Sequence, residues 1–204
     1  MKNIINCTCQ NEKVYSRYIS EVSGGHTYIL PDPDSDMREY CPFDDIASVT
    51  EDYLMIGYML ESGADTVENT LEFIKKYGMP HRGKRRLNAD KFADDARLLY
   101  LHLTEITSRP YPENPEWLLE TDPISAIVRA DGGESVIEWQ TTSLASAIEL
   151  GYMLLLGSEH CRLGICKNCG KPYFAQNPKT EFCQIACRNR YNVKLHRARQ
   201  KQGE

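Results

Sequence analysis

Four cysteines near the C-terminus have the spacing of a structural metal site. Cys166 and Cys169 form a Cys-x-x-Cys pair followed by Gly170, and Cys183 and Cys187 form a second pair after a thirteen-residue interval. Two pairs at this separation favour ligation of one zinc ion over the alternatives, which are buried free thiols and an iron–sulfur cluster. Four thiolates complete a tetrahedron and leave no position for a catalytic water, so the predicted zinc is structural.

The two cysteine pairs need a turn and a helix to bring their sulfur atoms together. A Cys-x-x-Cys-Gly turn, or knuckle, places the first two sulfurs at one point. Thr180 is the expected N-cap of a helix in which Cys183 and Cys187 lie four residues apart on one face. Residues 172–175 are expected to pair back as a hairpin arm, with a turn at 177–178. Knuckle, hairpin and helix together predict a treble-clef-like zinc finger.

The predicted helix continues to about Lys201 and is strongly basic. Six Lys or Arg residues and no acidic residue occur between positions 188 and 201. Arginine suits bidentate contacts to phosphate or guanine, and the amide side chains of this helix suit base edges. A solvated helix, or one paired with acidic residues of the same molecule, is the alternative. The candidate nucleic-acid contacts are Arg188, Asn189, Arg190, Asn192, Lys194, Arg197, Arg199 and Lys201.

Charge is divided unevenly along the chain. Residues 162–204 carry ten Lys and Arg against two acidic residues, whereas residues 1–161 carry 14 against 27. An acidic region joined to a basic one predicts that only the basic part meets a polyanion. A second basic run at 81–86, which includes Arg82 and Arg86, is either an auxiliary phosphate contact or a solvated loop.

The sequence lacks the motifs of several other classes of function. The five histidines fall in no metal or nucleophile motif, and there is no glycine-rich phosphate loop, so we expect no enzyme activity and no catalytic residue. The acidic loop at 31–36 lacks the glycine and glutamate of a calcium-binding EF-hand, which leaves a solvated loop as the main interpretation. No stretch has the length of a membrane span or signal peptide, and we expect a cytoplasmic protein with reduced cysteines and no membrane partner.

The remainder of the chain predicts an α+β fold that is mainly helical with a few strands. Apolar spacing and capping residues predict helices around 53–60, 67–77, 88–106 and 144–156, and short strands at 26–30, 124–129 and 135–140. The last two strands flank Asp131-Gly132-Gly133, a hairpin turn sequence, and the prolines of 108–115 predict a loop. We expect a mixed helix–strand domain over 1–160, which senses a signal or dimerises, and a finger over 161–204.

The finger sequence resembles the CGNR zinc finger of bacterial proteins described as stress-induced transcription regulators. The resemblance rests on Cys183, Ala186, Cys187, Asn189, Arg190 and the trailing His196-Arg197-Ala198-Arg199. The naming tetrad of the family reads Cys187-Arg188-Asn189-Arg190 here, with arginine in place of glycine, and the first knuckle is tighter than the common family form. The resemblance is specific over about forty residues.

This resemblance implies a DNA-binding transcription regulator with a mixed helix–strand N-terminal domain. The alternative is a zinc-stabilised interaction module that docks on RNA or on an acidic protein surface. Because a single finger covers few base pairs, a homodimer through the N-terminal domain is a further hypothesis. If the two domains are separate units, removing the zinc leaves the N-terminal domain folded.

Overall fold

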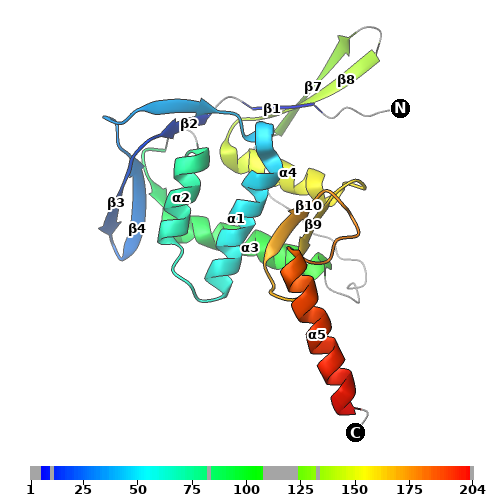
Figure 1. Cartoon of the computed structure of the whole chain (residues 1–204). Helices are drawn as coiled ribbons and strands as arrows, with labels where there is room; N and C mark the ends of the chain where they lie inside the picture. Colours follow the sequence, from blue (N-terminus) through cyan, green and yellow to red (C-terminus); the bar gives the residue numbers. More distant parts are fainter. Residues whose placement is uncertain (1–5, 10–11, 82–83, 108–123, 132–133, 203–204) are drawn as a thin grey trace.

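The structure is a computed structural model, and it describes residues 6–9, 12–81, 84–107, 124–131 and 134–202. It has the predicted mixed α+β class, with a body of helices flanked by short sheets and a long C-terminal helix that projects away from this body (Figure 1). The proline-containing stretch 108–115 lies outside the described residues.

The four predicted helices of the body are confirmed, and local sequence explains their ends. The Ser143 hydroxyl accepts the N–H of Ser146, whose own side chain returns to the Ser143 backbone, so a capping box starts the last of them. Asn88 Oδ1 accepts the Lys91 N–H at the start of the third helix. The helices are α1 (Ile46–Glu61), preceded by the 3-10 helix η1 (Pro42–Asp45), α2 (Val67–Tyr77), α3 (Ala89–Thr107) and α4 (Leu144–Leu156).

The body contains more strands than the sequence analysis predicted. The strand at 26–30 and the two strands around residues 132–133, which pair antiparallel, are confirmed, and the turn between them lies outside the described residues; four additional strands occur before residue 41. The sheets have the orders β1-β8-β7, with β1 parallel to β8, β3-β4-β6 and β2-β5. The strands are β1 (Asn6–Cys9), β2 (Glu12–Tyr15), β3 (Tyr18–Ser23), β4 (His26–Pro31), β5 (Met37–Tyr40), β6 (Leu87–Asn88), β7 (Ile124–Asp131) and β8 (Glu134–Thr141).

Helix α1 lies at the centre of the core and packs on α2, α3 and α4. Aromatic rings of Tyr53, Phe73, Tyr77 and Phe92 fill the space between α1, α2 and α3, with centroids 4.8 to 5.9 Å apart. Such ring clusters bury a large apolar area, which stabilises the three-helix packing. None of the described helices combines the length and apolarity that crossing a membrane requires.

The crossing of α1 and α3 requires a glycine. A Cβ atom on Gly57 would lie 2.3 Å from the carbonyl oxygen of Ala96 and 2.6 Å from its carbonyl carbon. These are backbone atoms of the facing helix, which cannot rotate away as a side chain would. Gly57 therefore allows a close helix–helix approach that any larger residue prevents.

We predict that Gly57→Ala destabilises the body although alanine is the better helix former. Forcing apart two packed helices costs about 1–3 kcal/mol, which lowers the thermal midpoint by roughly 2–12 °C in a chain of this size. Gly157→Ala is the matched control, because its Cβ would meet only Met153 O at 3.5 Å. Thermal unfolding followed by circular dichroism checks both; equal midpoints for the two variants would contradict the role of Gly57.

Candidate metal centre

The structure describes the finger, predicted over 161–204, as far as residue 202. Its strands β9 (Arg162–Ile165) and β10 (Pro172–Ala175) pair antiparallel, with Ile165 opposite Pro172. The knuckle therefore forms the turn of the hairpin, and the expectation of a hairpin turn at 177–178 is wrong. Residues 177–180 form a separate turn, in which Asn177 accepts the N–H groups of Lys179 and Thr180.

Backbone hydrogen bonds fix the shape of the knuckle. The Cys166 N–H donates to the Lys171 carbonyl and the Gly170 N–H donates to the Cys166 carbonyl, both at 2.9 Å. Gly170 has φ of 75°, a left-handed conformation that disfavours residues with a Cβ. The local sequence thus builds the tight turn that brings Cys166 and Cys169 together.

The structure gathers all four predicted cysteine ligands at one point. Their sulfur atoms all lie within 4.8 Å of one another, with 3.7 Å between Cys169 and Cys183 and 3.6 Å between Cys183 and Cys187. These separations are too long for disulfides, whose sulfurs are about 2.05 Å apart. They agree with the edge of about 3.8 Å in a tetrahedron whose metal–sulfur bonds measure about 2.3 Å. The cluster can therefore hold a metal ion.

The surroundings of the cluster favour some of its thiolates. Burial of the Cys166 thiol acts to raise its pKa, but N–H groups of Cys183, Cys169 and Asn168 outweigh burial and lower this pKa to about 6. The Asn168 side chain likewise lowers the pKa of Cys187. Burial, together with the neighbouring cysteines, raises the pKa of Cys183. A divalent cation coordinated by the sulfurs would supply the charge that stabilises all four thiolates.

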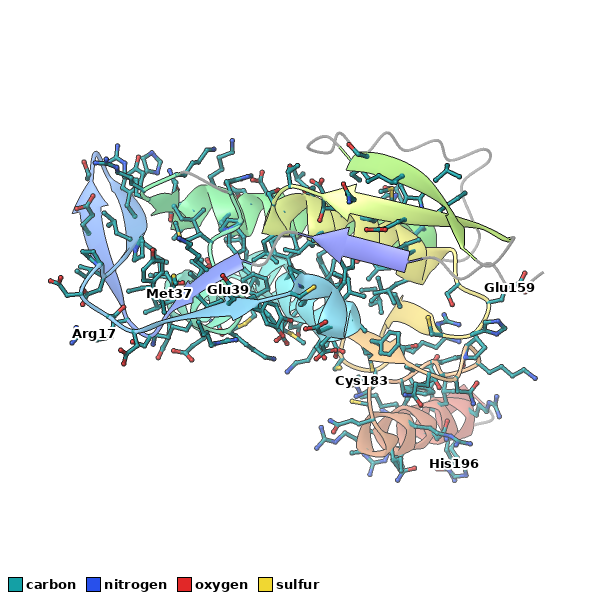
Figure 2. All side chains as sticks on the ribbon, turned by 90° about the horizontal axis from the view of Figure 1, so that it is seen from above. Arg17, Met37, Glu39, Glu159, Cys183 and His196 are labelled. Carbon is teal, nitrogen blue, oxygen red and sulfur yellow. The ribbon has the colours of Figure 1, made fainter. Side chains whose placement is uncertain are left out.

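The second cysteine pair is held differently from the prediction. Helix α5 (Ile185–Gln202) begins five residues after Thr180, so Thr180 is not its N-cap and Cys183 precedes the helix. The Thr180 carbonyl instead accepts the Tyr173 hydroxyl at 2.6 Å, and Gln184 O accepts the Cys187 N–H at 3.1 Å. Cys183 thus lies in the approach segment, residues 180–184, whereas Cys187 lies in the first turn of α5. Figure 2 labels Cys183 near the base of this helix.

The helical body also holds the knuckle, which the sequence analysis did not foresee. The Tyr58 hydroxyl donates to the Cys169 carbonyl at 3.3 Å, and the Tyr100 hydroxyl donates to the Gly170 carbonyl at 3.0 Å. Leu163 of β9 is 4 % exposed and belongs to the same apolar core as the helices of the body. These contacts join residues that are far apart in sequence, so no local sequence pattern predicts them.

Helix α5 displays the predicted nucleic-acid contacts to solvent. All eight of these side chains are exposed, and no ion pair within the described part of the chain involves a charged side chain of α5. The ring of Tyr191 packs on that of Phe182, with centroids 5.3 Å apart, and Cys187 is buried. Only the first turns of α5 therefore contact the rest of the finger, and Figures 1 and 2 show the remainder, with His196, standing apart from the body.

Local partners meet Arg86 of the second basic run and Asp32 of the acidic loop, the two weaker candidate sites. The Arg86 guanidinium lies 4.3 Å from the Tyr28 ring centroid and 3.7 Å from the Glu21 carboxylate, and its side chain remains half exposed. Arg82 and Gly83 lie outside the described residues. In the acidic loop, Asp32 pairs with Arg17 at 3.1 Å, and among the described side chains only the four cysteines form a metal-type cluster.

Comparisons of this chain with protein-family models, with curated proteins and with solved structures gave no match.

We predict that Cys187→Ser abolishes tight metal binding, because a hydroxyl replaces a buried thiolate ligand and leaves three sulfurs. The natural chain should carry one metal ion per molecule, measured by mass spectrometry of the purified protein. Cys161→Ser is the matched control, since Cys161 is a free, half-buried cysteine outside the cluster. A Cys187→Ser variant that keeps one metal ion per chain would contradict the assignment.

Proposed function

We propose that this chain is a DNA-binding transcription regulator in which a zinc-stabilised finger presents α5 to the duplex. The observation that carries the proposal is the state of α5, an exposed helix with six Lys and Arg residues and no acidic one between 188 and 201. Those charges have no counter-charge in the described ion pairs, and a polyanion is the ligand that such a helix attracts.

Zinc is the metal proposed for the four-cysteine centre. Thiolates are soft ligands that suit zinc, and a tetrahedral set of four cysteines is typical of structural zinc sites. Four protein sulfurs leave no coordination position for substrate or water, so the proposed role of the ion is to hold the knuckle, the approach segment and α5 together. The proposal assigns the chain no enzymatic role.

The dimensions of α5 support duplex DNA as the polyanion. Eighteen residues make a helix roughly 27 Å long, and its diameter of about 10–12 Å matches a major groove about 12 Å wide. At about 100° per residue, Arg190, Lys194, Arg197 and Lys201 lie along one face of the helix. Arg188 and Arg199 lie near the opposite face, so both walls of a groove would meet arginine or lysine.

The resemblance of the finger to CGNR zinc fingers supports the same proposal from sequence. The helix that carries the Cys187-Arg188-Asn189-Arg190 tetrad is the exposed one, and Asn189 and Arg190 are solvent-facing. Because the family glycine is replaced by Arg188, which is also exposed, this chain would place an additional positive charge beside the motif.

We predict duplex binding whose logarithm of affinity falls against the logarithm of salt concentration with a slope near −5, as about six phosphate contacts require. Arg197→Ala should make this slope shallower by about 1 and weaken binding to all sequences alike. Lys91→Ala, which removes an exposed charge from α3 in the body, is the control and should change neither quantity. Fluorescence anisotropy at several salt concentrations measures both; a flat salt response would rule out the proposal.

The alternative function is an interaction module that docks on RNA or on an acidic protein. The same exposed arginines suit either partner, and the experiment that separates them is selection of random duplex DNA by the full chain. Enrichment of one sequence motif supports the regulator. Indifference to duplex sequence together with tight binding to structured RNA supports the alternative.

We further propose that the regulator acts as a homodimer through its N-terminal domain. One helix reads only a few base pairs, and two copies would double the length of the site and bind it far more tightly than one copy does. We expect twice the chain mass of 23.3 kDa by light scattering, alone or on a selected duplex. A monomeric mass under both conditions would exclude dimerisation.

A further inference from the structure

Two tyrosines of the helical body contact the backbone of the knuckle directly beside a predicted zinc ligand. Tyr58 comes from α1 and Tyr100 from α3, and their hydroxyls bond the carbonyls of Cys169 and Gly170 at 3.3 and 3.0 Å. The two rings pack edge to face, with centroids 5.8 Å apart and planes at 71°. Tyr100 is 7 % exposed, and its hydrogen bond to the Gly170 carbonyl is partly buried.

These hydrogen bonds complete those of the knuckle. Within the knuckle, the carbonyls of Cys166 and Lys171 accept N–H groups of the turn itself. The carbonyls of Cys169 and Gly170 accept the hydroxyls of the two tyrosines. The backbone that orients the sulfur of Cys169 is therefore held from the body.

The position of the two tyrosines depends on the close crossing of α1 and α3. Tyr58 follows Gly57, and Tyr100 lies one helical turn after Ala96, the residue whose carbonyl Gly57 approaches. Because the two helices touch there, both hydroxyls reach neighbouring carbonyls of one turn. Helix α1 also packs against β10 of the finger.

We propose that Tyr58 and Tyr100 are positioning residues of the metal centre and couple metal binding to the packing of α1 on α3. A metal ion held by the four cysteines would order the knuckle, the ordered knuckle would offer two carbonyls to the tyrosines, and the tyrosines would then hold the two helices at their crossing. Such coupling is reciprocal, so loosening the crossing weakens metal binding by the same factor by which metal loss loosens the crossing. The inference rests on the zinc site of the proposed function and is independent of nucleic-acid binding.

This coupling predicts a different response to metal removal from the one expected for two separate units. Chelation should loosen α1 and α3 around the crossing, in addition to unfolding the finger. The domain boundary at residue 160 remains a prediction. The proposed coupling links metal binding on one side of this boundary to helix packing on the other.

The first test measures metal retention by the full chain against a chromophoric zinc chelator. Loss of one hydroxyl, in Tyr58→Phe or Tyr100→Phe, should weaken retention about fivefold, and the double variant should weaken it about twentyfold. Tyr28→Phe is the matched control, because it removes a hydroxyl with no described hydrogen bond and keeps the ring beside Arg86. A double variant that retains zinc within twofold of the natural chain overturns the proposal.

The second test needs no variant and uses amide hydrogen exchange of the natural chain. Removing the metal with a chelator should accelerate exchange at least tenfold in α1 around 57–61 and in α3 around 97–101. Helix α2, which has no contact with the knuckle among the described hydrogen bonds, should be less affected. Unchanged exchange in α1 and α3 after complete metal removal also overturns the proposal, whereas a natural chain that carries no metal would refute the zinc site itself.

Discussion

The approach of α1 to α3 at Gly57 is the contact on which the remaining arrangement depends. The missing side chain lets the α1 backbone approach the Ala96 carbonyl, and helices this close bury their facing apolar side chains with little void. Two consequences follow from one geometric constraint. The aromatic cluster around Phe73 closes the far end of the crossing, and Tyr58 and Tyr100 emerge together at the near end, next to the knuckle.

A series of contacts that begins at this crossing determines where α5 lies. The body fixes the hairpin through β9 and the knuckle, and the knuckle supplies half of the sulfur cluster. The cluster supplies the remaining constraint on where α5 begins. Charge then separates the two parts, since residues 1–161 carry an excess of acidic side chains and residues 162–204 an excess of basic ones. This division of charge would repel a polyanion from the body and attract it to the helix.

Sequence reasoning succeeds where the determining interactions are local. The helix Leu144–Leu156 was predictable to the residue because Ser143 and Gly157 delimit an apolar run, and the four cysteines were predictable because metal ligation constrains their spacing. Strands β3 and β5 escaped prediction because they lie at the surface: five of six residues of β3 are exposed, and neither strand has the alternation of buried and exposed residues that marks a half-buried strand. The contacts of Tyr58 and Tyr100 with the knuckle were not predicted, because they form only when α1 packs on α3.

The later start of α5 shows how tertiary contacts override a good capping residue. Thr180 has the side chain of an N-cap, but its carbonyl is bonded by the Tyr173 hydroxyl of β10, which holds it in a turn outside the helix. Glu181 is tied to Lys167 of the knuckle by an ion pair and by the backbone. Cys183 lies in this approach segment, and α5 begins after it, at Ile185. If one helix ran through both cysteines, its own backbone would set its direction. The direction of α5 is instead set by the hairpin, the approach segment and the sulfur cluster together.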